Sequence, residues 1–154
     1  MRKTIAVVLC VISACSSAGG PKSNLTNLAG TPYNPAAFRT RLSAMSAADR
    51  VIYEVDPEEM NWAEQNLNAV LDREVKLAVE DIGVIRIAEV VPGSIAEIRG
   101  LRAGDLVRGI NGVAVDLSNL HAFLAEELRT RERPLVLDVE RDGGRMTIEF
   151  RRLR

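Results

Sequence analysis

The sequence has few of the residues on which metal centres, disulfide frameworks and membrane spans depend. Of its 154 residues only Cys10 and Cys15 are cysteines, so the body of the chain has no thiolates for a zinc site or a disulfide framework. The longest apolar run, residues 5–14, is too short for a membrane-spanning helix, which needs roughly 20 residues. The formal net charge of −1 argues against a polycationic surface for nucleic acid. These absences exclude a polytopic membrane protein, a zinc ribbon and, at this length, a multidomain enzyme.

Residues 1–14 have the layout of a secretory signal. Two basic residues come first, residues 5–12 are apolar, and Ser13 and Ala14 are small. Because such a segment is removed from the mature protein, it takes no part in the predicted fold. The alternative is a buried N-terminal strand, but no polar alternation follows the apolar run.

The signal ends in a more specific motif. Ile12-Ser13-Ala14-Cys15 resembles the bacterial lipobox. The resemblance implies cleavage before Cys15 and lipidation of that residue with diacylglycerol and a further acyl chain such as palmitate. Each buried methylene adds about 0.8 kcal/mol to membrane binding, so such an anchor is effectively permanent. Ser16 stands where an aspartate often retains a lipoprotein at the inner membrane, which implies the outer membrane, facing the periplasm.

Residues 16–35 are rich in Ser, Gly, Asn, Pro and Thr and poor in large apolar side chains. Such a stretch cannot bury enough surface to offset the entropy of ordering, so we predict a flexible tether. At its end a proline suits a first helical turn, and Phe38, Leu42 and Met45 recur at helical spacing. For residues 15–49 we therefore expect an acylated N-terminus, a tether and a short amphipathic helix.

A strand and a capped helix come next. Apolar side chains alternate over residues 50–55, which predicts a short strand. The segment Asp56-Pro57-Glu58-Glu59 supplies a helix cap, a proline suited to the first position and two acids at the positive end of the helix. An apolar stripe at spacings of three and four then predicts a helix over residues 57–72.

Beyond this helix the apolar period changes from helical to two. Val75, Leu77 and Val79 alternate with Lys76 and Ala78, which predicts a half-buried strand. We predict an α+β domain of five or six strands and two helices, near 80 residues and large enough for one core without disulfides. The other predicted elements are strands over residues 84–91, 106–110, 135–140 and 145–150, a return strand with Val113 and Val115, and helices over residues 94–98 and 117–128.

Four short motifs recur in the order and spacing of one family. They are Val90-Val91-Pro92-Gly93-Ser94-Ile95-Ala96, Gly100-Leu101-Arg102-Ala103-Gly104-Asp105, Ile110-Asn111-Gly112 and Val139-Glu140-Arg141-Asp142-Gly143. Together they resemble a PDZ domain of the bacterial kind, as in HtrA-type periplasmic proteases and type II secretion C-proteins. The resemblance covers residues 75–153 and implies a partly open β-barrel or sandwich. The expected domain spans residues 50–154, including the preceding strand and helix.

The residue types in these motifs, which we call the fold signature, can be explained by the backbone geometry that each turn requires. Gly100 and Gly104 can adopt positive φ without penalty, which allows two close turns around Leu101. Asp105 can accept backbone N–H groups from the turn. Asn111-Gly112 suits the tight type I′ hairpin. These roles are structural, so the signature predicts a fold and not a ligand.

The resemblance implies a peptide groove between the strand over residues 75–79 and the helix over residues 117–128. A partner segment would join the sheet there as an extra strand, and loop N–H groups would hold its C-terminal carboxylate. The expected groove residues are Leu71, Asp72, Arg73, Glu74, Val75, Lys76, Leu77, Val79, Leu117, His121 and Leu124.

The loop before this strand departs from the family pattern. Leu71-Asp72-Arg73-Glu74 has no glycine and carries two acids, which oppose a carboxylate, although Arg73 could compensate in part. Internal segments or folded partners need only an open strand edge. A third possibility is that the helix over residues 57–72 covers the groove.

Catalytic motifs are lacking. The only histidine is His121, and there is no nucleophile–histidine–acid series, GxSxG elbow, HExxH or P-loop, so we predict no enzyme, cofactor or small-molecule substrate. His121 is either a groove residue or a solvated helix position. A helix start explains Asp56, Glu58 and Glu59 better than a metal site does. The sequence predicts a lipid-anchored binding module for an envelope protein or peptide; the alternatives are a structural part of an envelope assembly and a regulator of a periplasmic protease.

Overall fold

The computed structural model describes residues 33–46, 49–80, 83–130 and 133–154. The predicted signal over residues 1–14, the predicted lipidation site Cys15 and nearly all of the predicted tether lie outside the described residues. Within the described ranges, no helix is both long enough and apolar enough to cross a membrane.

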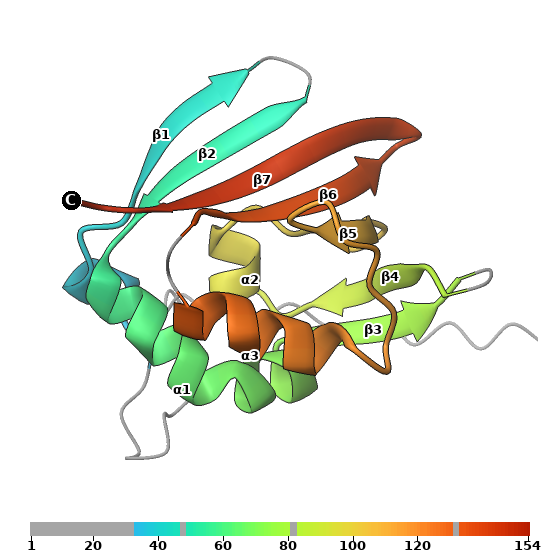
Figure 1. Ribbon diagram of the computed structural model, residues 1–154, viewed down its shortest axis with the longest axis horizontal. Coiled ribbons are helices and arrows are strands. Elements are labelled where there is room, and N and C mark those ends of the chain that lie inside the picture. The colour runs from blue at the N-terminus through green and yellow to red at the C-terminus, as the bar shows by residue number, and fades with distance from the viewer. Residues whose placement is uncertain (1–32, 47–48, 81–82, 131–132) are drawn as a thin grey trace, which may run out of the picture.

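One curled sheet forms the frame of the described chain (Figure 1). Its strand order is β1-β2-β7-β6-β5-β4-β3, so β1 and β3 are the two edges. Neighbouring strands are antiparallel except β2 and β7, which run parallel. The strands are β1 (Arg41–Ser46), β2 (Arg50–Val55), β3 (Val75–Val79), β4 (Ile85–Val90), β5 (Leu106–Ile110), β6 (Leu135–Arg141) and β7 (Gly144–Arg152).

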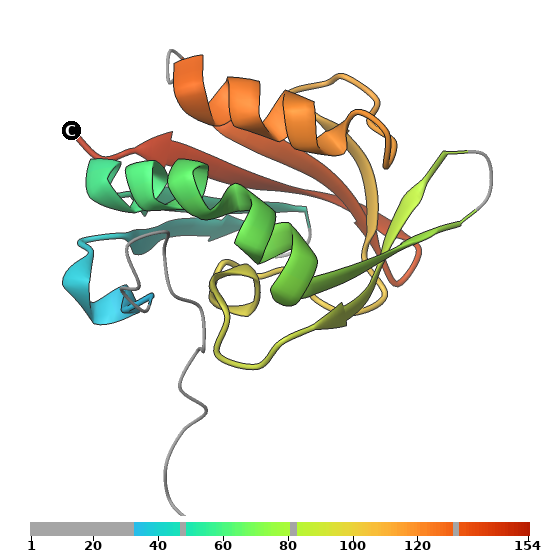
Figure 2. The ribbon, with the colours of Figure 1, turned by 90° about the horizontal axis from the view of Figure 1, so that it is seen from below.

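Two helices cover the open side of this sheet. Figure 2 shows α1 (Pro57–Arg73) and α3 (Leu120–Thr130) side by side, and they contact one another. A third, short helix, α2 (Ile95–Ile98), follows β4. The predicted α+β class is therefore confirmed. From residue 75 onward the structure has five strands, within the predicted five or six, and the sheet gains β2, which was predicted separately, and β1, which was not.

The start of α1 is as the sequence predicts. The side chain of Asp56 accepts a hydrogen bond from the backbone N–H of Glu58 at 3.1 Å, and Pro57 occupies the first turn. Because the first N–H groups of a helix have no partner within it, this cap stabilises the helix by about 1 kcal/mol.

The main core lies between the sheet and the two long helices. Ile85, Ile110 and Ile148 come from three different strands and are fully buried. Leu67 of α1 and Leu128 of α3 close the same cluster from the helix side. Burial of each such side chain contributes roughly 1.5–3 kcal/mol, so this cluster is the main source of stability.

The short helix predicted from Phe38, Leu42 and Met45 is wrong. The structure has one 3-10 turn, Pro35–Ala37, followed by strand β1. β1 pairs with β2, with Leu42 opposite Tyr53, and the side chains of Leu42 and Met45 are 49 % and 69 % exposed. Pairing with a neighbouring strand therefore outweighs the helical spacing of three apolar residues.

The predicted hairpin after β5 is correct in its turn but not in its return strand. Asn111 and Gly112 both have positive φ, 51° and 77°, as the type I′ prediction requires. The return strand with Val113 and Val115 is wrong, because only a single bridge joins Ile110 to Val113.

The second helix also begins later than predicted, at Leu120. A turn precedes it in which the side chain of Asp116 accepts hydrogen bonds from the N–H groups of Ser118 and Asn119. Leu117 therefore lies in this turn and not on the helix.

The glycine turns and the last hairpin are joined by one buried ion pair. Arg141 Nε lies 2.7 Å from Asp105 Oδ1, and its Nη2 donates to Asp105 Oδ2 and to the carbonyl oxygen of Gly100, each at 2.7 Å. Asp105 also accepts from the N–H of Arg102 at 2.8 Å. Two motifs that are 36 residues apart in the sequence are thus parts of one interaction.

We expect R141A to lower the free energy of unfolding by about 3 kcal/mol, because it leaves the buried carboxylate of Asp105 without its counter-ion. R108A is the matched control, since the Arg108–Glu140 pair is more exposed and its loss costs at most about 1 kcal/mol. Urea unfolding measures both variants. Equal losses in the two variants would contradict the role assigned to the Asp105–Arg141 pair.

Candidate peptide-binding groove

A groove of about 730 Å³ runs along the start of the edge strand β3. The last turn of α1 forms its end wall, and the turn before α3 together with the start of α3 forms its side. Nine of the predicted groove residues meet here: Leu71, Asp72, Arg73, Glu74, Val75, Lys76, Leu77, Leu117 and His121. Their role in binding stays a prediction.

Two predicted groove residues lie elsewhere. Val79 is at the far end of β3, 60 % exposed and outside the groove. Leu124 lies one turn further along α3 and lines a deeper cavity. His121 is exposed and lines the groove, and its contact with a ligand stays a prediction.

The deeper cavity lies beneath the groove and measures about 180 Å³. Its lining is almost wholly apolar, and Leu71, Val75 and Leu77 border both the cavity and the groove. An apolar protein cavity of about 150 Å³ is enough for benzene. The cavity under β3 is therefore large enough for one large apolar side chain.

The strand beside the groove has one free edge. β3 pairs only with β4, and no described strand lies on its other side. Val75 and Leu77 point toward the core, whereas Lys76 between them is exposed. An added strand would find unpaired backbone groups along β3 and an apolar floor beside it.

The end wall of the groove carries the carbonyl end of α1, the exposed acid Asp72 and the exposed base Arg73. Helix α1 ends there at Arg73, and the last carbonyl groups of a helix carry a partial negative charge. Asp72 is exposed on the same turn, and Glu74 follows as the C-cap residue. Across β3, Lys76 is already paired with Glu89 at 3.1 Å. This wall is poorly suited to hold a carboxylate.

Glu74 is the most unusual residue of the wall. Its side chain is buried, with 2 % of the residue exposed, and Oε2 accepts a hydrogen bond from Ala96 N–H at 3.4 Å. Oε1 has no hydrogen-bond partner. Burial raises the pKa of Glu74 to about 7, against the opposing effect of the Ala96 and Ile95 N–H groups.

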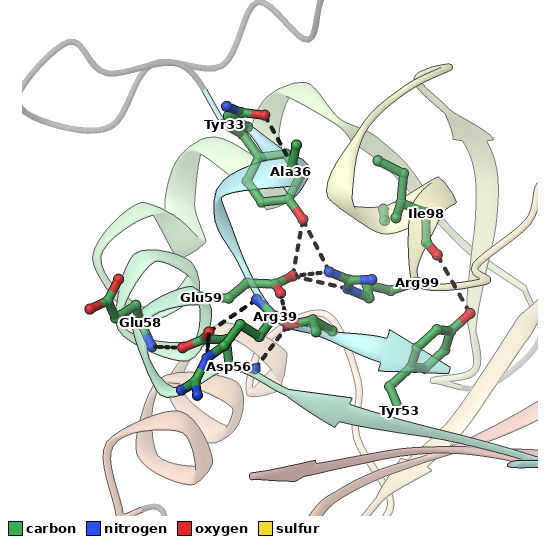
Figure 3. Close-up of polar contacts among 12 residues, drawn as sticks. Tyr33, Ala36, Arg39, Tyr53, Asp56, Glu58, Glu59, Ile98 and Arg99 are labelled. Atoms are coloured by element: carbon green, nitrogen blue, oxygen red, sulfur yellow. Dashed lines mark hydrogen bonds and ion pairs between the residues drawn. The ribbon is translucent and has the colours of Figure 1, made fainter. Parts of the chain in front are cut away.

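A second polar cluster lies at the opposite end of α1 (Figure 3). The buried carboxylate of Glu59 accepts from Arg99 Nη2 at 2.5 Å, from the Tyr33 hydroxyl at 3.0 Å and from the hydroxyl of Thr40. Burial, with the Glu59 carboxylate as the next cause, raises the pKa of Tyr33. Trp62 of α1 is buried against the Tyr33 ring, with 4.8 Å between the ring centroids.

This cluster attaches the residues before β1 to α1 and to the end of α2. Reasoning from sequence assigned Glu59 only to a helix start and missed its buried partners, because nothing in the local pattern links it to Arg99, 40 residues later. Among the described residues, no group of three or more His, Cys, Asp or Glu side chains could hold a metal ion.

We expect the stability of the protein to fall as pH rises from about 4.5 to about 7, in part because of Glu74. The unfolded chain loses this proton near its ordinary pKa of 4.5, whereas the folded chain keeps it until about 7. E74Q removes this contribution, so its stability relative to wild type should rise by up to about 3 kcal/mol across the window. Urea unfolding at several pH values measures the difference. The exposed D72N variant is the control, and a constant difference for E74Q would refute the assignment.

Removing the charge of Glu59 should loosen the segment before β1. E59Q leaves Arg99, whose side chain is 11 % exposed, without its counter-ion, so we expect a loss of about 3 kcal/mol. Thermal unfolding and amide exchange of β1 report this change. E58Q alters the exposed neighbouring acid and should have little effect; a similar loss in E58Q would show that the cluster is not the cause.

Comparisons with known proteins bear on the residues around this groove. A family model described as PDZ domain matches residues 86–141. No curated protein matches the chain. A solved structure of the PDZ domain of EpsC from Vibrio cholerae is 24 % identical, with a TM-score of 0.38 over 51 % of this chain and 94 % of that one. A second, longer structure of that domain is 22 % identical, with a TM-score of 0.41 over 61 % and 91 %.

The matched residues run from β4 to the last residue of β6 and include the glycine turns, the Asn111-Gly112 hairpin and Arg141. PDZ domains are in general interaction modules that bind proteins or peptides and not catalysts. Residues 86–141 of the chain therefore match a PDZ domain, and β5, β6 and all but the first residue of β4 lie within the match.

Proposed function

We propose that this protein is a non-catalytic, lipid-anchored module that recruits or positions a partner in the bacterial cell envelope by strand addition to β3. The single observation that carries the proposal is the free edge of β3 beside a groove that shares apolar lining residues with an apolar cavity. Backbone hydrogen bonds along β3 would supply affinity, and the cavity would select one large apolar side chain of the partner.

The partner segment is internal to its own chain. A C-terminal carboxylate at the end wall would meet the carbonyl end of α1 and the acids Asp72 and Glu74. An internal segment presents no such charge and still forms the backbone hydrogen bonds. The groove thus favours an extended segment that passes through it.

The membrane part of the proposal rests on the sequence. The lipobox-like segment before Cys15 is the basis for anchoring, and residues 16–32 would join the lipid to the first described residue, Tyr33.

An amide NMR titration of the chain with extended eight-residue peptides tests binding. Acetylated and amidated peptides should shift the amides of β3 and α3, and the same peptides with a free carboxylate should bind no better, because the end wall repels it. L77R places a charge on the floor between groove and cavity and should abolish the shifts, whereas V79R, on the same strand beyond the groove, should keep them.

The titration distinguishes strand addition at β3 from the alternatives. Shifts confined to the other edge strand, β1, or no shifts with any peptide, would overturn strand addition at β3. The domain would then act with its groove closed, as a structural part of an envelope assembly or as a regulator of a periplasmic protease. Palmitate labelling of the wild-type chain in bacterial cells, and its loss in C15S, tests the anchor separately.

A further inference from the structure

The cavity beneath α1 is large for the core of so small a domain. Its volume is about 180 Å³. Protein interiors are close-packed, and voids larger than a water molecule are few. A cavity also destabilises the folded state in proportion to its volume. A molecule that filled this space would therefore stabilise the domain.

The cavity extends along the length of α1. On the helix its lining runs from Glu59 in the first turn to Leu71 in the last turn, a rise of about 18 Å at 1.5 Å per residue. Helix α3 contributes Leu120, Leu124 and Leu128, and the core face of the sheet closes the opposite side. The space is therefore long and narrow and lies inside the main core.

The two charged residues that line the cavity are already paired with each other. Glu59 and Arg99 lie at one end, where Arg99 Nη2 donates to Glu59 Oε1 at 2.5 Å. The second carboxylate oxygen accepts from the hydroxyl of Thr40. The surface that faces the cavity is apolar. A polar group on a ligand would therefore lose its water and gain no partner.

We propose that this cavity is a binding site for a small hydrocarbon ligand. A cavity of about 150 Å³ holds benzene, which has six carbon atoms, so 180 Å³ has room for about seven. Removal of apolar surface from water would supply the affinity. The inference goes beyond the proposed function, which uses the cavity for a side chain of the partner. The ligand is a free molecule that would compete for the same space.

Entry of a ligand needs no break in a helix or strand. Leu71 and Leu77 are partly exposed and border both the cavity and the groove. Exposed side chains change rotamer within nanoseconds. A small ligand would enter where these two side chains rotate apart.

Benzene is the probe for this site, and phenol is the matched polar control. Amide and methyl NMR spectra of the chain are recorded at increasing concentrations of each. We expect benzene to shift the signals of lining residues such as Val107 and Leu124. Phenol should bind at least about tenfold more weakly, because its hydroxyl would be buried without a partner. Equal binding of the two compounds, or no shifts with benzene up to its solubility, would overturn the site.

A variant that fills the cavity tests the location of the bound probe. Ala63 lines the cavity on α1, whereas Ala69 on the same helix does not. A63L should abolish the benzene shifts, because three added carbon atoms leave too little space for the ring. A69L should keep them. The assignment is wrong if both variants lose the shifts or if both keep them.

The stability of variants without any probe gives an independent measurement. Val107 and Val139 are both buried and lie opposite each other on β5 and β6, but only Val107 lines the cavity. V107I should raise the midpoint of thermal unfolding by about 2–4 °C, because the added methyl group enters the cavity. V139I should lower the midpoint, because it overpacks a filled part of the core. A lower midpoint in both variants would show that side chains already fill the space and would overturn the proposal. No peptide is used in these experiments, so their results are independent of strand addition at β3.

Discussion

The buried pair of Asp105 and Arg141 is the interaction on which the rest of the domain depends. It joins the glycine turn that follows α2 to the hairpin between β6 and β7, and so connects the centre of the sheet to the strands that lead to its free edge. Both oxygens of the carboxylate and two nitrogens of the guanidinium are used. Because neither charge could be buried alone without a large cost in free energy, the two chain segments must meet in this arrangement.

The groove arises from incomplete coverage of a curled sheet. α1 and α3 lie side by side over the core, but α1 ends where β3 begins, and α3 starts only at Leu120 (Figure 2). The space that remains along the first residues of β3 forms a groove, which shares lining residues of β3 with an apolar cavity. The same helix end that leaves this space also places its carbonyl groups at the wall. Shape and charge at this site therefore have one origin.

Much of the fold could be predicted from local patterns. The cap at Asp56, the helix over residues 57–72, the alternation of Val75, Leu77 and Val79, and the Asn111-Gly112 turn each depend on neighbouring residues, and the structure has all of them. The predictions that were wrong concern segments whose form is decided by a distant partner. Residues 41–46 form a strand because they pair with β2. The spacing of three apolar residues does not indicate that pairing.

By itself the sequence determined the fold class and the order of most elements, because periodicity, caps and turn chemistry act over a few positions. The set of expected residues near β3 came from the resemblance to a PDZ domain. Only the tertiary structure decided that β2 joins β7 in parallel, that Glu59 meets Arg99 and that Glu74 is buried with one oxygen unpaired. Each of these depends on contacts between segments far apart in the chain. Burial and pairing are properties of the packed molecule. They give Glu74, an acidic residue at a helix end, a buried carboxyl group with a raised pKa.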